Sequence, residues 1–260
     1  MFGQVALAAG AALFVAMVAL WGLSLRRRDA SIVDIFWGPG FLLVAGLGLW
    51  LGEGPGPRRL LVFALVALWA LRLASHIAAR NLGRGEDYRY REMRERHGAR
   101  FGLVSLFSVF LLQGAILWVV ALPLMAAQSA PSPVGLGFRD LAGALLWATG
   151  FLIEAVADRQ LARFRARGGP GRVMDRGLWR YSRHPNYFGE AVLWWGLYLV
   201  AAGTPGGGWT IVSPLLMTFL LVRVSGVALL EKGMAKRPGW AEYAARTSAF
   251  VPLPPRRAAR

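Results

Sequence analysis

Long hydrophobic runs separated by short polar segments dominate the chain. A helix needs about 20 residues to cross a bilayer core, and seven of the runs are about that long. They cover residues 2–25, 31–51, 60–79, 101–128, 141–157, 187–203 and 209–230. Backbone polar groups in lipid must pair within their own segment, and these runs lack the alternation of barrel strands, so the pattern predicts helices. We therefore predict an all-α polytopic membrane protein, with seven transmembrane helices in one domain over residues 1–260.

Composition supports this class and excludes several kinds of site. Hydrophobic residues make up 56% of the chain and mean hydropathy is +0.44, which is too apolar for an ordinary soluble domain. The chain has no cysteine, so disulfides, thiolate metal sites and a cysteine nucleophile are excluded. Three histidines are too few for a typical multi-histidine metal site, and we expect no bound metal.

Lysine and arginine are unevenly distributed between the two predicted sides of the membrane. With the N-terminus outside, 25 of the 30 lie in inner segments, three in outer segments and two, Arg72 and Arg223, within spans. Because cytoplasmic loops carry the excess of positive charge, this bias predicts an N-out, C-in orientation. The net charge of +16 is consistent with contacts to anionic membrane lipids and with binding of a phosphate-bearing ligand. We expect no nucleic acid partner.

Polar side chains inside the spans gather toward the predicted cytoplasmic side. They are Asp34, Arg72, His76, Glu154, Asp158, Asn186, Glu190, Arg223 and Glu231. A charged group in a bilayer costs about 2.5–3.5 kcal/mol on insertion scales and usually faces a cavity or a partner. The set predicts a cavity open to the cytoplasm; the alternative is a group of structural salt bridges that tie the helices together.

The segment before the sixth predicted span suggests a ligand at the start of that helix. Pro185 suits a first helical turn, and helix N-termini favour anions. The inner loops 80–100 and 158–186 are rich in arginine with tyrosine interleaved. Arginine binds phosphate bidentately, and these side chains also stack on planar rings. We expect Asn186 and Glu190, one turn apart, to point into the cavity.

Several motifs together resemble one known family. RGLWRYSRHPNYFGE (176–190), followed by a tryptophan-rich span and LLEKGMAKRPGWAEYAARTSAFVPLPP (229–255), resembles the C-terminal region of the steroid 5α-reductase family. DIFWGPGF (34–41) and NLGRGEDYRYREMRERHG (81–98) resemble its bacterial branch. The resemblance implies a seven-helix enzyme of the bacterial inner membrane, with a reductase-like half over about residues 101–260. Such an enzyme uses NADPH to reduce a C=C bond conjugated to a ketone.

The resemblance also implies which residues hold the cofactor on the cytoplasmic side. The family's sixth-helix Asn and Glu correspond to Asn186 and Glu190. Its fifth-helix Asn and Asp fall at Glu154 and Asp158, so the first of these departs from the family pattern. With neighbouring loop and span residues, the predicted NADPH-binding set is Arg72, Arg80, Arg84, Tyr88, Glu154, Asp158, Arg165, Arg172, Tyr181, Arg183, His184, Asn186, Glu190, Arg223 and Glu231.

The predicted catalytic residues differ from those of the family. The family polarises the ketone with a second-helix Glu and a third-helix Tyr, whereas this chain has Asp34 in the second span and Trp69 at the Tyr position. We predict Asp34, Trp37 and His76 as catalytic residues, with a protonated Asp34 stabilising charge on the carbonyl oxygen.

The expected substrate is a hydrophobic small molecule, a steroid or isoprenoid enone, bound by a monomer. A cofactor site of helices and loops is required, because the G-x-G-x-x-G fingerprint of soluble dinucleotide-binding domains is absent and GGPGR (168–172) is a poor match. NADPH rather than NADH follows from the family and from the arginine excess, since a ribose 2′-phosphate favours arginine.

Two other functions remain open from the sequence. RHPNYFGE also resembles isoprenylcysteine carboxyl methyltransferases, which use S-adenosylmethionine, but those enzymes typically carry two adjacent Glu where this chain has Glu231 and Lys232. The third possibility is a non-catalytic protein that binds lipid or sterol, or a small transporter. Transport is disfavoured because no internal repeat is visible.

Overall fold

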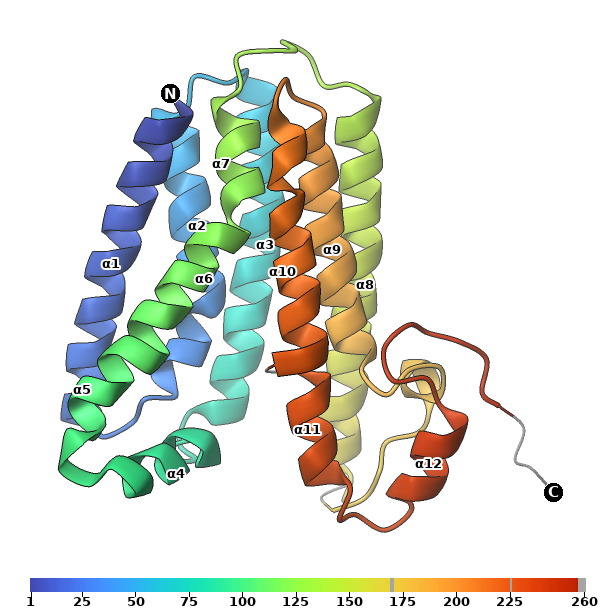
Figure 1. Cartoon of the computed structure of the whole chain (residues 1–260). Coiled ribbons are helices and arrows are strands. Elements are labelled where there is room, and N and C mark those ends of the chain that lie inside the picture. The colour runs from blue at the N-terminus through green and yellow to red at the C-terminus, as the bar shows by residue number, and fades with distance from the viewer. Residues whose placement is uncertain (169–170, 225, 257–260) are drawn as a thin grey trace. The chain divides into compact units, whose positions relative to one another are not determined.

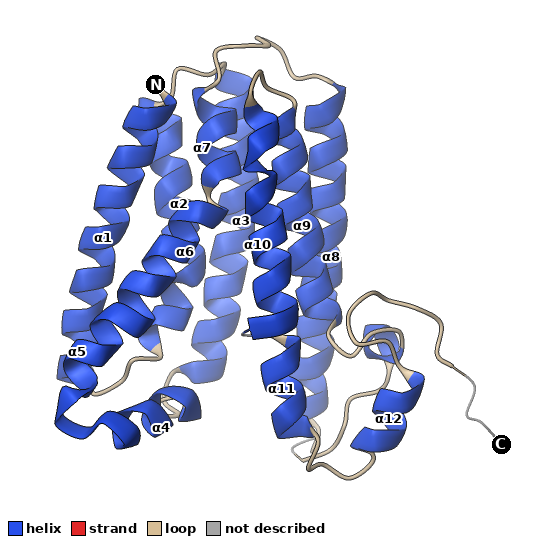
Figure 2. Ribbon diagram, in the orientation of Figure 1, coloured by secondary structure: helices blue, strands red, loops and turns tan. Residues whose placement is uncertain are grey.

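The computed structural model describes residues 1–168, 171–224 and 226–256, and these are mostly helical (Figure 2). Among them there is no strand, only an isolated parallel bridge between Ser182 and Ser248. The helices are α1 (Phe2–Arg27), α2 (Ile32–Leu51), α3 (Gly56–Asn81), α4 (Tyr88–His97), η1 (Gly98–Arg100), α5 (Phe101–Ser105), η2 (Leu106–Leu111), α6 (Leu112–Val120), α7 (Leu122–Ser129), α8 (Phe138–Ala166), η3 (Gly177–Arg180), α9 (Pro185–Ala202), η4 (Gly207–Ile211), α10 (Val212–Phe219), η5 (Leu220–Val224), α11 (Val227–Met234) and α12 (Trp240–Arg246).

Six helical segments of the described chain are long and apolar enough to cross a membrane. They are Phe2–Arg27, Ile32–Leu51, Gly56–Asn81, Tyr88–Val120, Phe138–Ala166 and Gly207–Met234. The all-helical membrane class is therefore confirmed. The predicted sixth span corresponds to α9, which is not among these six segments. It has 18 residues and carries Asn186 and Glu190 in its first two turns, so its continuous apolar run is shorter than the helix. A seventh crossing and the N-out orientation stay predictions.

Three predicted elements have different boundaries in the structure. The predicted span 101–128 is divided after Val120, and α7 begins at Leu122 with Pro123 in its first turn. Proline lacks an N–H and clashes with the carbonyl four residues earlier, so it starts a new helix here. The predicted span 209–230 divides into η4, α10, η5 and α11, with Ser225 outside the described residues. The predicted inner loop from residue 158 begins as helix, because α8 continues to Ala166.

The chain forms two compact units, which we describe separately. Unit 1 comprises Met1–Asp140 and Val200–Thr210, and unit 2 comprises Leu141–Leu199 and Ile211–Arg260. In unit 1, α1, α2 and α3 run side by side and α4 lies across one end (Figure 1). Its fully buried core includes Phe41, Val66, Trp69, Phe110 and Leu117.

A buried ion pair closes the end of unit 1 opposite α4. Arg58 at the start of α3 has no exposed surface, and Asp140 in the first turn of α8 is 2% exposed. The guanidinium donates from Nε to Asp140 Oδ1 (2.8 Å) and from Nη2 to Oδ2 (2.9 Å). It also donates to the carbonyls of Pro133 (2.8 Å) and Gly135 (2.9 Å). Arg58 therefore fixes the 130–137 loop. The sequence analysis had counted Arg58 only as one of the basic residues in outer loops.

In unit 2, glycines bring α8 and α9 into backbone contact. A Cβ on Gly189 would lie 2.6 Å from both Glu154 N and Gly150 O, and one on Gly196 would lie 2.5 Å from Trp147 N. A side chain at either position would push the helices apart, and only glycine permits this approach. The contact places the turn of α9 that carries Glu190 against the backbone of Glu154.

Candidate functional site

A polar pair from the two packed helices forms the centre of the candidate site in unit 2. Asn186 Nδ2 donates to Asp158 Oδ1 at 3.1 Å. The other amide atom, Asn186 Oδ1, is buried and accepts no hydrogen bond. Leaving a buried acceptor unsatisfied costs about 1–3 kcal/mol. A ligand that donates an N–H or O–H to this oxygen would remove that cost.

Three carboxyl groups are buried on α8 and α9, and one of them belongs to this pair. Glu154 is 2% exposed, Asp158 6% and Glu190 8%. Each of them takes part in further polar interactions. Carboxylates are rarely buried without partners, and their concentration on two adjoining helices is typical of a functional site rather than of a lipid-facing surface.

A second polar group lies where α9 begins and involves α11. Glu231 Oε1 is 2.8 Å from Arg183 Nε and 3.2 Å from His184 Nε2. The His184 ring is buried, and it stacks on the ring of Tyr187 with centroids 5.7 Å apart and planes at 6°. Pro185 is the first residue of α9, as the sequence predicted. Two predicted cofactor residues, Arg183 and Glu231, are therefore paired with each other.

The C-terminal cap, which we define as α12 with residues 247–256, is fastened to the segment before α9. Arg183 N donates to Ser248 O (2.8 Å), and Ser182 Oγ donates to Phe250 O (2.7 Å). The hydroxyl of Tyr243 donates to Trp179 O at 2.6 Å. Burial raises the pKa of the Tyr243 phenol, so this group remains a neutral donor. The motif around 176–190 and the C-terminal motif thus form one structure.

The other predicted residues of unit 2 are more exposed. Arg165, in the last turn of α8, is exposed but has polar interactions. Arg172, Tyr181 and Arg223 are exposed, and Arg172 contributes its carbonyl to a long hydrogen bond from Arg237 (3.5 Å). In the predicted arginine loop, 169–170 lie outside the described residues. These arginines are therefore exposed, whereas the carboxyl groups on α8 and α9 are buried.

Unit 1 has its own polar cluster, centred on Asp34 in the first turn of α2. Arg89 Nη2 donates to Asp34 Oδ2 and the Tyr90 hydroxyl donates to Oδ1, both at 2.7 Å. Gln113 Nε2 lies 3.3 Å from the same hydroxyl. The sequence did not identify Tyr90 as a partner. Both Asp34 oxygens accept hydrogen bonds, one of them from a guanidinium. The protonated Asp34 expected from the sequence stays a prediction.

Further hydrogen bonds attach α4 to the segment before α2. Glu86 accepts from Ala30 N (2.8 Å) and from Arg94 Nη2 (2.7 Å). Asp87 N donates to Ser31 Oγ at 2.7 Å. These contacts explain why the acidic residues of 80–100 lie among arginines: they fix α4 against α2.

Asp87 caps α4, and this cap is expected to depend on pH. It accepts from Arg89 N (3.0 Å) and Arg89 Nε (2.9 Å). Burial raises the pKa of Asp87, but the hydrogen bonds from Arg89 lower it more, so the net pKa lies below the ordinary 3.8. The stabilisation is present above pH 3.8 and is lost as pH falls through the lowered pKa.

We therefore expect Asp87→Ala to lower stability at pH 7 by about 0.5–2 kcal/mol, the usual contribution of an N-cap. The difference from wild type should shrink in strong acid. Thermal unfolding in detergent at both pH values measures this. If wild type and Asp87→Ala differ in stability by the same amount at pH 7 and in strong acid, the charge of Asp87 does not contribute to the cap.

The remaining predicted residues of unit 1 lie on α2, on α3 and between α3 and the start of α4. Trp37 packs edge-to-face on Phe41, with centroids 5.2 Å apart. Arg80 is exposed, and its Nε donates to Asn81 Oδ1 at 2.9 Å. Arg84 and Tyr88 are exposed. The last two, Arg72 and His76, are partly buried on α3 and have polar interactions. The predicted convergence of these groups with those of unit 2 stays a prediction.

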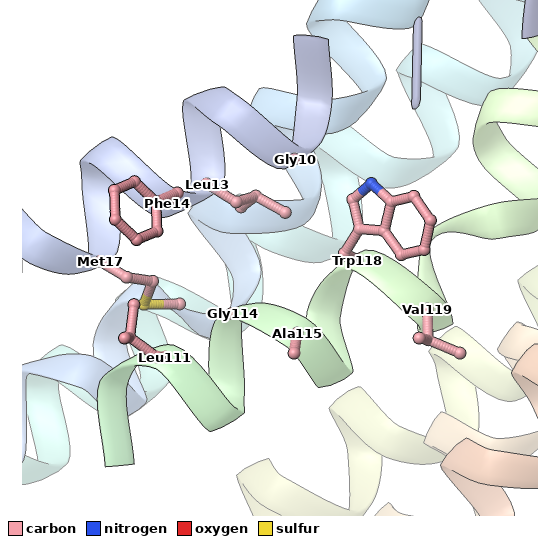
Figure 3. A pocket seen from close by; sticks show the side chains of 9 residues that line it. All are labelled: Gly10, Leu13, Phe14, Met17, Leu111, Gly114, Ala115, Trp118 and Val119. Atoms are coloured by element: carbon pink, nitrogen blue, oxygen red, sulfur yellow. The ribbon is translucent and has the colours of Figure 1, made fainter. Parts of the chain in front are cut away.

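An apolar cavity of about 410 Å³ lies in unit 1 between α1 and the α6 segment (Figure 3). Phe14 and Met17 line it from α1, and Gly114 and Trp118 from α6. The polar atom of Trp118, its indole Nε1, already donates to Ala6 O at 2.8 Å. The cavity has the size of a small-molecule site, but its side chains offer no free polar group. It suits a hydrocarbon body.

Comparison with known families gives the chain a family but no activity. The family model described as "Protein of unknown function (DUF1295)" matches residues 20–247. The chain belongs to this family. All predicted site residues of this DUF1295 protein lie within the matched region, which extends over both units.

Two curated proteins are similar to parts of this DUF1295 chain. "Uncharacterized protein C594.04c" of Schizosaccharomyces pombe is 29% identical over 208 residues, which is 70% of this chain and 60% of that protein. "3-oxo-5-alpha-steroid 4-dehydrogenase 1" of Bos taurus is 39% identical over 69 residues, which is 26% of this chain and 27% of that protein. The chain thus covers less than two thirds of either relative. No solved structure matches it.

Proposed function

We propose that this DUF1295 protein is a membrane-embedded, NADPH-dependent reductase that adds hydride to the C=C bond of a steroid or isoprenoid enone. The observation that carries the proposal is the Asn186–Asp158 pair, whose free amide oxygen is buried beside the carboxyl groups of α8 and α9. The partial similarity to a 3-oxo-5-alpha-steroid 4-dehydrogenase supports it.

The residues of unit 2 fit the chemistry of a nicotinamide dinucleotide. Asn186 Oδ1 is an acceptor for an N–H donor such as a carboxamide. The exposed arginines after α8, including Arg172, can form bidentate contacts with phosphate. When bound, the cofactor would supply the hydride, and these side chains would hold it in place and exclude water.

In unit 1, the group suited to polarise a carbonyl is the phenol of Tyr90. Asp34 Oδ1 accepts the hydrogen bond of the Tyr90 hydroxyl, and Arg89 Nη2 donates to the other carboxyl oxygen, both at 2.7 Å, so the phenol is held in place. A phenol aimed at the carbonyl oxygen stabilises the charge that develops there during reduction. We propose Tyr90 as the donor, which would turn its single O–H from Asp34 to the carbonyl oxygen when substrate binds, and Asp34 as the residue that positions the phenol. Catalytic roles for Trp37 and His76 stay predictions.

One observation favours a second candidate function, the binding of lipid or sterol without catalysis. The cavity of about 410 Å³ in unit 1 is lined by apolar side chains and its only side-chain polar atom is satisfied. Such a site would hold a hydrocarbon body whether or not a reaction follows.

A thermal-shift titration of the purified protein in detergent separates these functions. NADPH, NADH, S-adenosylmethionine and a 3-oxo-Δ4 steroid are tested in parallel. A ligand that binds only the folded state stabilises it by about 2.7 kcal/mol at 100 times its Kd.

We expect NADPH to raise the unfolding temperature, and NADPH absorbance to fall when an enone substrate is added. A shift with S-adenosylmethionine alone would instead support a methyltransferase. A shift with the steroid alone would support lipid binding, and either result would overturn the reductase.

A further inference from the structure

The carboxylate of Glu231 lies against one particular nitrogen of His184. Its Oε1 atom is 3.2 Å from His184 Nε2 and 2.8 Å from Arg183 Nε. A carboxylate has acceptor sites only, whereas a neutral imidazole has one donor nitrogen and one acceptor nitrogen. Two acceptors cannot form a hydrogen bond, so Nε2 must carry the hydrogen. We infer that Glu231 fixes His184 in the tautomer protonated on Nε2, and leaves Nδ1 as a hydrogen-bond acceptor at the start of α9.

Glu231 is available for this role because Arg183 keeps it charged and in place. Arg183 also donates from Nη2 to Glu231 Oε2 at 3.2 Å, so both carboxylate oxygens are engaged. Ion pairing of this kind favours the deprotonated carboxyl group, which is the form that can only accept. Arg183 is thus a positioning residue for Glu231, and its Nη1 and Nη2 atoms donate within the protein.

The C-terminal cap holds Arg183 in turn. Arg183 Nη1 donates to Ala244 O at 2.7 Å, and its guanidinium carbon is 5.8 Å from the centre of the Trp240 ring. A planar guanidinium that is bound on both edges and lies near an aromatic ring has little freedom to turn toward a ligand. The cap therefore positions His184 indirectly: it holds Arg183, Arg183 holds Glu231, and Glu231 contacts the His184 ring.

His184 itself has little freedom to reorient. Its backbone N–H donates to Ser182 Oγ at 3.1 Å, its side chain is 5% exposed, and its ring is stacked on Tyr187. A buried ring with one nitrogen bound to a fixed carboxylate keeps the other nitrogen in one place. His184, two residues before Asn186, therefore presents Nδ1 as an acceptor in a fixed position.

His184 Nδ1 could accept a hydrogen bond from the ligand. This role rests on the proposed function. Asn186 Oδ1 is a buried acceptor without a donor, and His184 Nδ1 would be a second acceptor on the same turn of chain. Two acceptors suit a ligand that presents an NH₂ group or two neighbouring donors. Arg183 and Glu231 would then contribute to binding by orientation alone.

The tautomer can be measured directly by NMR. Protein labelled with ¹⁵N-histidine is examined in detergent at a pH of about 9, where histidines of ordinary pKa are neutral. Long-range ¹H–¹⁵N spectra distinguish a protonated ring nitrogen from a bare one. The chain has three histidines, and His76 and His97 lie in unit 1, so their signals serve as internal controls. His184→Gln assigns the third signal.

We expect His184 to carry its proton on Nε2 alone. In Glu231→Ala this preference should give way to a mixture of tautomers, with the signals of His76 and His97 unchanged. Glu231→Gln keeps an acceptor oxygen and should restore much of the preference, a rescue that general destabilisation would not produce.

A wild-type His184 protonated on Nδ1 or on both nitrogens would overturn the inference. An unchanged tautomer in folded Glu231→Ala would also overturn it. If Glu231→Ala does not fold, the wild-type spectrum alone still decides. The result is independent of the cofactor: failure of NADPH to bind the wild type would reject the reductase and leave the tautomer assignment standing.

Discussion

Replacement of Arg58 by alanine is expected to lower the unfolding free energy by about 3–5 kcal/mol, the usual cost of removing one partner of a buried ion pair. The guanidinium makes four hydrogen bonds, two to Asp140 and two to loop carbonyls, in a site without exposed surface. Its loss leaves Asp140 buried without its cation and the loop carbonyls without a donor. Thermal or denaturant unfolding in detergent measures the effect.

Arg139 provides the matched control, because it precedes Asp140 but is exposed, with one hydrogen bond to Ala202 O (2.6 Å). Arg139→Ala should change stability by less than about 1 kcal/mol. A double variant, Arg58→Met with Asp140→Leu, removes both charges and should be more stable than Arg58→Ala. Equal effects of Arg58→Ala and Arg139→Ala would show that the buried pair does not stabilise the fold.

The second large effect is expected at Asn186. We expect Asn186→Ala to weaken NADPH binding at least about 100-fold, because it removes two hydrogen-bonding groups at once, each worth about 1–3 kcal/mol when buried. One is the free acceptor Oδ1, and the other holds Asp158 at 3.1 Å. Cofactor-induced thermal shift measured over a concentration series gives the change in Kd.

Asn186→Asp separates the two contributions, since it keeps an acceptor but replaces the amide donor to Asp158 by a second carboxyl group. It should bind NADPH more weakly than wild type and be less stable. Arg139→Ala, an exposed change at the start of α8, is the control for a general effect of removing a polar side chain, and its NADPH affinity should match wild type. NADPH binding by folded Asn186→Ala at wild-type affinity would remove Asn186 from the site.

Local patterns in the sequence were sufficient to predict much of the helical structure and the ends of several helices. Continuous apolar runs indicate membrane helices because the bilayer leaves few alternatives for the backbone. Pro185 was a reliable helix start because its geometry suits a first turn. Asn186 and Glu190 were correctly placed in the first turns of that helix for the same reason. These features depend on residues within a few positions of each other.

Only the tertiary structure decided which polar and charged groups pair. Arg58 and Asp140 are 82 positions apart, and Asp34 and Tyr90 are 56 apart. The chain has 30 basic and 14 acidic residues, so composition permits many pairings. Arg183 was expected at the cofactor, and its Nη1 and Nη2 atoms donate to the C-terminal cap and to Glu231. A side chain's role follows from its nearest partners in space, and those are set by which helices pack together.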